Sequence, residues 1–191
     1  MPAMLSVIMD YKYVGLLACI LLVVGLAFVV YRWPLDRHKT FSRRAATNMA
    51  SIIYYFALFL IVLTLFVIFF IEWFTPTFSV SWWFNAIFIA SAIFQIACTL
   101  TPDKGGRMSR WHGFFAGTSA LLLAPPLIIL VATGGIAIPA KIITVVSLGI
   151  MATCSYLAFS APNHEPRNFL LLQCLYYGSF LIPILSMSYL L

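Results

Sequence analysis

Charged side chains are scarce in this sequence. Asp, Glu, Lys and Arg make up 8% of its 191 residues, whereas hydrophobic residues make up 63% and the mean hydropathy is +1.05. A soluble domain carries about 25% charged residues, and so few charges could not cover the surface of a soluble globule. The composition therefore excludes an ordinary soluble domain and indicates a membrane protein.

Cysteines are also few, and none has the spacing of a metal site or a redox motif. The four lie singly inside apolar runs, at Cys19, Cys98, Cys154 and Cys174. This pattern argues against a disulfide framework and against a zinc site, and we expect no cofactor. The apolar runs carry no acidic residue or arginine in their middle, which argues against an ion-coupled pump.

Long apolar runs are what the chain does contain. A membrane-spanning helix needs about 20 mostly apolar residues, and six segments qualify, at roughly 13–32, 49–72, 81–101, 112–132, 138–160 and 168–190. The first is followed by Arg32-Trp33-Pro34, a stop-transfer pattern rather than a cleavage site. The runs predict an all-α polytopic membrane protein, a bundle of six transmembrane helices in three hairpins that form one domain over residues 1–191.

The cations are distributed unevenly in this chain, whose net charge is +6. The bends after the first, third and fifth runs hold nine of the eleven Lys and Arg, and Lys12 and Lys141 are the other two. Short loops rich in Lys and Arg stay on the cytoplasmic side. We therefore predict a multi-pass protein of the plasma or inner membrane, with these three bends inside and both termini outside. Cations in bends do not form one basic face, so no nucleic-acid partner is expected.

All three histidines fall on the predicted cytoplasmic side. His38 follows the first run, His112 opens the fourth and His164 follows the fifth, while Asp36 and Asp103 lie in the first two of these bends. Imidazoles and carboxylates that converge from three hairpins can bind a metal or act as acid and base. These five residues are the candidate catalytic set. The alternative is that they are solvated loop residues, because their spacing matches no motif such as HExxH.

Arginines lie on the same predicted side, at Arg43, Arg44, Arg107 and Arg110. Lys and Arg at the inner surface of a membrane attract anionic lipid headgroups. These four residues are therefore candidates for binding such headgroups. The alternative is that they only fix the orientation of the chain in the membrane.

Three further features concern packing inside the bundle. Gly113 and Gly117 form a GxxxG pattern, which predicts close approach of another helix, more readily one of this chain than one of a second copy. Pro125-Pro126 should kink or break the fourth helix, and broken helices often line cavities. Three amide side chains are expected to make hydrogen bonds between helices: Asn85, Gln95 and Gln173.

The bend between the third and fourth runs carries a family resemblance. A run that ends in Thr101-Pro102-Asp103, a short polar bend, and His112 at the start of the next run together resemble the membrane family of unassigned function grouped with FRAG/DRAM/SFK-type proteins. Members of that family are compact six-helix proteins. The resemblance implies a bundle fold and a role near lipid handling or membrane-linked regulation, and it implies no catalytic residue.

Two functional readings are compatible with these features. The first is a non-enzymatic membrane protein that binds lipids or a protein partner, which fits the lack of buried charges and of catalytic spacing. The second is a membrane-embedded enzyme or small-solute transporter that uses the His and Asp cluster or a cavity beside Pro125-Pro126. A closed core would favour the first reading, and a polar cavity lined by two or more histidines would favour the second.

Overall fold

The computed structural model describes residues 2–35, 39–104, 106–160 and 168–190. Within these ranges every regular element is a helix. In chain order the elements are α1 (Pro2–Arg32), α2 (Phe41–Ala45), α3 (Met49–Phe69), the π-helical turn η1 (Phe70–Phe74), α4 (Thr75–Thr77), α5 (Trp83–Leu100), α6 (Gly106–Ala132), α7 (Ile138–Ser160) and α8 (Phe169–Tyr189).

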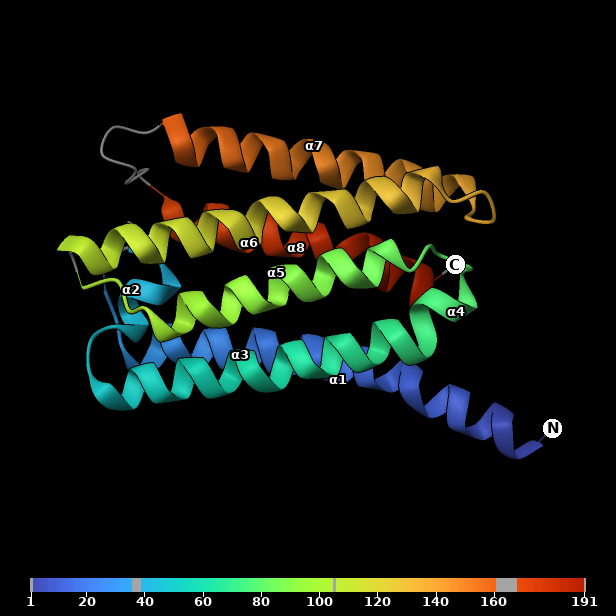
Figure 1. Cartoon of the computed structure of the whole chain (residues 1–191), viewed down its shortest axis with the longest axis horizontal. Helices are drawn as coiled ribbons and strands as arrows, with labels where there is room; N and C mark the ends of the chain where they lie inside the picture. Colours follow the sequence, from blue (N-terminus) through green and yellow to red (C-terminus); the bar gives the residue numbers. More distant parts are fainter. Residues whose placement is uncertain (1, 36–38, 105, 161–167, 191) are drawn as a thin grey trace.

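Six helical segments in the described ranges are long and apolar enough to cross a membrane. They are Tyr11–Arg32, Met49–Thr77, Trp83–Leu100, Arg107–Ala132, Ile138–Ser160 and Phe169–Tyr189. The long helices pair in chain order, α1 with α3, α5 with α6 and α7 with α8 (Figure 1). The predicted bundle of six apolar helices in three hairpins is therefore confirmed, and it indicates an integral membrane protein.

The hairpins place both termini at one end of the bundle (Figure 1). The short helix α2 and the bend between α5 and α6 lie at the opposite end. We call this opposite end the α2 end; it comprises residues 33–35, 39–48 and 101–104 and the first turns of α6. Two of the three arginine- and lysine-rich bends thus share one end of the molecule, away from the termini.

The helix bounds differ from the predicted ones where polar residues extend a helix beyond its apolar run. α6 begins at Gly106 rather than near 112, so its first turns contain the polar segment with Arg107 and Arg110. Pro125-Pro126 does not break α6, which continues to Ala132. The neighbouring helix α8 contributes a polar contact here, since the Tyr176 hydroxyl donates to Ala120 O in the turn before the prolines.

Aromatic rings fill the core near the end that holds the termini. Phe70 lies at the centre, with its ring centroid 4.6 Å from that of Phe88 and 5.0 Å from that of Phe84, both in edge-to-face geometry. Such pairs add about 0.5–1.5 kcal/mol beyond the area they bury. These contacts hold η1 against α5 and join the first hairpin to the second.

Lys12 connects three elements at the same end of the bundle. Its ammonium nitrogen lies 5.1 Å from the ring centroid of Tyr189 and 5.6 Å from that of Trp73. The Tyr189 hydroxyl also donates to the backbone oxygen of Lys12. Cation–π contacts of this kind are favourable where the cation is partly desolvated, so α1, η1 and α8 are held together here.

The three amide side chains do make hydrogen bonds between elements. Asn85 Oδ1 accepts from Thr75 Oγ1 at 2.8 Å, and Gln95 Oε1 accepts from Ser119 Oγ at 3.3 Å. The prediction for these residues is confirmed, and Gln173 is described below with the functional site. Ser119 also pairs with Ser91. Ser91 Oγ donates to Ser119 O at 2.8 Å, and the single proton of Ser119 Oγ is shared between Gln95 Oε1 and Ser91 O, which lies 3.0 Å away.

Among the residues that the structure describes, no helix comes close to the GxxxG glycines. Gly113 is exposed, and a Cβ atom added there would meet no heavy atom within 4 Å. At Gly117 an added Cβ would lie 3.9 Å from Phe159 Cζ, which is an ordinary van der Waals contact. The spacing identifies a small-residue face but not a helix that packs on it, and here that face is largely open.

Close approach occurs instead between α1 and α3. A Cβ atom added at Gly15 would lie 2.6 Å from the Phe69 ring, and one at Gly25 would overlap Leu58 Cδ1. Small residues let helix backbones come together in membranes, where packing rather than the hydrophobic effect drives association. Gly15 and Gly25 therefore set the spacing of the first hairpin.

We predict that Gly15→Ala destabilises the protein relative to Gly149→Ala by about 1–3 kcal/mol, the usual cost of overpacking. Both changes gain the same helix propensity, but only the first adds a methyl group against a ring that is 1% exposed. An alanine at 149 meets nothing within 4 Å. Thermal unfolding in detergent would measure the difference, and equal midpoints for the two variants would contradict the glycine contact.

Candidate functional site

Polar side chains gather at the α2 end, and α2 itself is positioned by its first residues. Thr40 is the N-cap, and its Oγ1 accepts from the backbone N–H of Arg43 at 3.1 Å. The backbone N–H of Phe41 donates to Gln173 Oε1 of α8 at 3.2 Å. Since the first N–H groups of a helix have no partner within it, these two bonds explain why α2 begins here and why it lies close to α8.

Arg44 is a structural residue of this end. Its side chain is buried, with 2% exposed, and it donates to Leu35 O at 2.6 Å and to Trp33 O at 3.5 Å. A buried guanidinium requires such acceptors because desolvation of an uncompensated charge is costly. Arg44 therefore ties the segment after α1 to α2, and the structure does not present it as a headgroup ligand.

Asp103 links α2 to the bend between α5 and α6. Its Oδ2 accepts from Arg43 Nε at 2.8 Å, and its Oδ1 accepts from Ser109 Oγ at 2.6 Å. The Asp103 side chain is 11% exposed and that of Arg43 is 34% exposed. The carboxylate thus joins the first hairpin, through α2, to the start of α6 in the second hairpin.

The environment of Asp103 favours its charged form. Burial acts to raise the pKa of its carboxyl group, but the hydrogen bonds from Ser109 and Arg43 and the electrostatic interactions with Arg43 and His112 act to lower it. Together the lowering effects prevail, and the pKa of Asp103 is below its ordinary value. Asp103 is therefore a carboxylate near neutral pH and suits a positioning role better than that of a general acid.

His112 lies in the second turn of α6 and is buried, with 7% exposed. Its Nδ1 is 2.7 Å from Thr101 O and 3.2 Å from Cys98 O. Both partners can only accept, so Nδ1 carries the proton and donates to them. The last carbonyls of a helix lack partners within it, and His112 therefore caps the end of α5 from the neighbouring helix.

A thiol lies beside both ring nitrogens of His112. Cys98 Sγ, a weak donor, is 3.5 Å from Nδ1 and 3.6 Å from Nε2. Cys98 is 3% exposed, so its sulfur is not open to a bulky substrate. This imidazole–thiol pair has the residue types of a nucleophilic dyad, but the burial of the thiol favours a packing contact.

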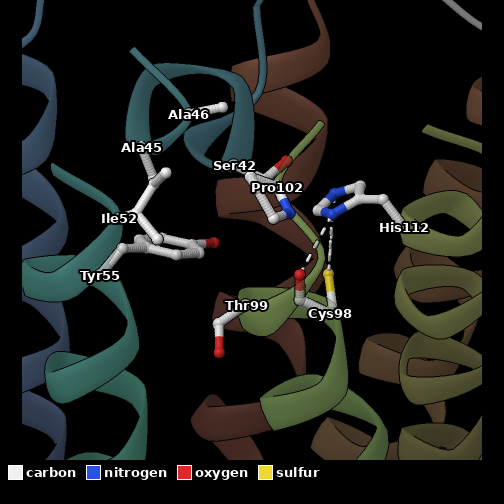
Figure 2. A pocket seen from close by; sticks show the side chains of 9 residues that line it. All are labelled: Ser42, Ala45, Ala46, Ile52, Tyr55, Cys98, Thr99, Pro102 and His112. Carbon is white, nitrogen blue, oxygen red and sulfur yellow. Dashed lines mark hydrogen bonds between the residues drawn. The ribbon is translucent and has the colours of Figure 1, made fainter. Parts of the chain in front are cut away.

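A small hollow lies between α2, α3, α5 and the start of α6 (Figure 2). Its lining residues are Ser42, Ala45, Ala46, Ile52, Tyr55, Cys98, Thr99, Pro102 and His112. The volume open to the centre of a water molecule is about 10 Å³. Sites for small-molecule ligands measure about 300–1,000 Å³, so this hollow does not accommodate a metabolite.

The structure brings together only part of the predicted cluster. His112 and Asp103 share the α2 end, but backbone oxygens rather than a carboxylate orient the His112 ring. His38, His164 and Asp36 lie outside the described residues. In the part of the chain that the structure describes, no three His, Cys, Asp or Glu side chains come close enough to hold a metal ion.

Two of the polar residues at this site were missed in the sequence. Tyr55 lies in the second turn of an apolar run and Thr99 near the end of another, where each is typical of a helix core. Their shared position depends on how α3 packs on α5, which no local pattern encodes. The sequence feature that comes closest to predicting them is their position, because both lie about two helical turns or less from a predicted cytoplasmic bend.

We predict that Asp103→Asn lowers thermal stability near neutral pH and flattens its dependence on acid pH. A carboxyl group whose pKa is lowered by folding contributes stability above its unfolded pKa and loses it as the pH falls through the folded value. The parent protein should therefore lose this contribution below about pH 4, where the two proteins converge. Unfolding midpoints in detergent between pH 3 and 7 would measure this.

Glu72→Gln is the matched control, because Glu72 is an exposed carboxylate at the other end of the bundle. The Glu72→Gln variant should lose as much thermal stability in acid as the parent protein does. An Asp103→Asn variant with the parent's full acid dependence would show that another group is responsible.

Comparison with known proteins adds no relative. No family model, no curated protein and no solved structure matches the chain. The function of the protein is therefore inferred from its own residues and geometry.

Proposed function

We propose that this integral membrane protein is non-enzymatic and binds the headgroups of anionic lipids at its α2 end. The observation that carries the proposal is the position of three cations there. Lys104, Arg107 and Arg110 are exposed at this end, on the bend and the first turns of α6. Arg43 and Arg44, in contrast, are engaged with Asp103 and with backbone oxygens.

The exposed cations provide the right chemistry for a lipid surface. A Lys or Arg near an anionic leaflet contributes about 1 kcal/mol of attraction, and Arg can hold a phosphate with two N–H groups at once. Trp111 lies between these arginines and the membrane run of α6, and it is 48% exposed. Exposed Trp is typical of the headgroup level, so this surface sits where phosphates lie.

The site geometry supports binding rather than turnover. The hollow beside His112 has about 10 Å³ open to the centre of a water molecule, and the Cys98 thiol is buried. The resemblance of Thr101-Pro102-Asp103 and His112 to the family grouped with FRAG/DRAM/SFK-type proteins agrees with a role in lipid handling or membrane-linked regulation. An enzyme or transporter of small molecules would require a larger polar space than the hollow beside His112.

The proposed orientation places the α2 end in the cytoplasm. Nine of the eleven Lys and Arg fall in the three bends after the first, third and fifth apolar runs, and short cytoplasmic loops are rich in these residues. Both termini, which share the opposite end (Figure 1), then face outward. In the plasma or inner membrane the exposed cations would meet the anionic cytoplasmic leaflet.

We predict that Arg107→Gln combined with Arg110→Gln weakens binding of anionic phosphatidylglycerol on the order of 10- to 30-fold. The figure is the loss of about 1 kcal/mol for each cation, converted to affinity. Native mass spectrometry of the protein titrated with phosphatidylglycerol or with zwitterionic phosphatidylcholine would measure it. Binding of phosphatidylcholine should be unchanged.

Lys141→Gln is the matched control, because Lys141 is a cation in the first turn of α7, at the end away from α2. It should keep the parent's preference for the anionic lipid. A double variant that also keeps this preference would contradict the proposed headgroup site.

We predict that a cysteine at Thr47 is protected from an impermeant thiol reagent in intact cells, whereas one at Ser81 reacts. Both positions are exposed, and they lie in bends at opposite ends of the bundle (Figure 1). The parent chain is the background control, since its four cysteines lie within the membrane-spanning helices. Labelling at 47 but not at 81 would reverse the orientation.

A further inference from the structure

The hollow at the α2 end brings together polar groups from three different helices. Tyr55 comes from α3, Cys98 and Thr99 come from the end of α5, and His112 comes from α6 (Figure 2). Apolar residues of α2 and the α2–α3 turn cover one side, among them Ala45 and Ala46. Polar groups of separate hairpins thus face a common space beneath α2.

Tyr55 requires a hydrogen-bond partner in this space. Its side chain is 5% exposed, and its hydroxyl makes no hydrogen bond to any other residue that the structure describes. Figure 2 shows the ring directed from α3 toward the side of the hollow where Pro102, Cys98 and His112 lie. A hydroxyl of a buried side chain that finds no partner costs about 1–3 kcal/mol, so a donor directed into this largely apolar hollow favours an acceptor within it.

His112 offers an acceptor to the same space. Its Nδ1 carries the proton because it faces Thr101 O and Cys98 O, so Nε2 has a free lone pair in the neutral ring. Cys98 Sγ lies 3.6 Å from Nε2 and 3.5 Å from Nδ1, so the sulfur is not directed at Nε2 in particular. A thiol is a weak donor and leaves this nitrogen available for a stronger one.

The volume of the hollow limits the size of the ligand that it can hold. Its volume open to the centre of a water molecule is about 10 Å³, which is at the lower limit for one buried water, about 10–15 Å³. A buried water also needs two to four polar partners, and Tyr55, His112 and Cys98 provide a donor, an acceptor and a sulfur.

We propose that the hollow is a binding site for a single water molecule, which accepts a hydrogen bond from the Tyr55 hydroxyl and donates one to His112 Nε2. This water links α3 of the first hairpin to the α5–α6 hairpin beneath α2. It also stabilises the His112 tautomer that caps α5, because donation to Nε2 keeps the proton on Nδ1. The proposal does not depend on the lipid-binding function.

The first test is Tyr55→Phe, which keeps the ring and removes only the hydroxyl. If the hydroxyl binds a water, its loss leaves that water short of a donor and should lower the unfolding midpoint in detergent by about 2–4 °C. If the hollow is dry, removal of an unpartnered hydroxyl should leave the midpoint unchanged or raise it, and this outcome would overturn the proposal. Tyr156→Phe is the matched control, because Tyr156 is 70% exposed on α7, and it should have no effect.

The second test observes the ligand directly and does not rely on stability. A high-resolution map of the parent protein should show one density peak within hydrogen-bond distance of both Tyr55 Oη and His112 Nε2, and a map of Tyr55→Phe should show it weakened or lost. A map that resolves ordered waters elsewhere in the buried core but shows none in the hollow would overturn the proposal.

Discussion

The α2 end of this protein depends on the requirement that buried backbone oxygens and charges find partners without help from bulk water. In a membrane-spanning bundle an unsatisfied backbone group costs several kcal/mol. His112 meets this requirement for the end of α5 by donating to Cys98 O and Thr101 O. Arg44 meets it for the segment after α1 by donating to Leu35 O and Trp33 O. Both side chains bind backbone oxygens that lie 9 to 14 residues away in the sequence, so the loops at this end are fixed by neighbouring elements.

The same requirement separates the cations of this end into two groups. Arg43 and Arg44 have acceptors within the protein and are partly or fully buried. Lys104, Arg107 and Arg110 are exposed and remain available to ligands outside it. Cationic residues thus have two roles at this end. The buried arginines hold its segments together, and the exposed cations form a positively charged surface. The sequence offers all four arginines as candidates for binding headgroups, because burial cannot be predicted from a basic bend.

Much of the architecture followed from the length and composition of the apolar runs. Six runs long enough to span a membrane predict six helices, and short bends predict antiparallel neighbours, which is what Figure 1 shows. The amides were also interpretable, because a polar group inside a span has few alternatives to an interhelical hydrogen bond. Helix contacts were less predictable. The GxxxG at Gly113 and Gly117 faces mostly open space, whereas Gly15 and Gly25, which match no motif, admit α3 closely.

The candidate site was predictable only in part for the same reason. His112 and Asp103 flank one bend, and their proximity is a local property of the sequence. Tyr55 reaches the same site from α3 only because the first two hairpins pack together, and no residue spacing in the sequence predicts that contact. The sequence therefore identified two of the residues that adjoin this bend, but not Thr99 at the end of the preceding run nor Tyr55 from a distant helix.

The three hairpins are held by different interactions, which determines how firmly each helix is attached. The first has glycine contacts and the second has the Ser91–Ser119 pair and His112. In α7, by contrast, the hydroxyls of Thr144 and Thr153 donate back to their own helix.

No hydrogen bond joins an α7 side chain to another helix within the described residues, so this helix is attached by packing alone. It also buries the smallest share of its apolar stretch, 22% against 28–39% for the other spans, and it lies at the edge of the bundle in Figure 1. Helix association in a membrane depends on packing and hydrogen bonds. Within the described residues α7 is therefore joined to its neighbours by packing rather than by side-chain hydrogen bonds, whereas at the α2 end an ion pair between Arg43 and Asp103 links the first two hairpins.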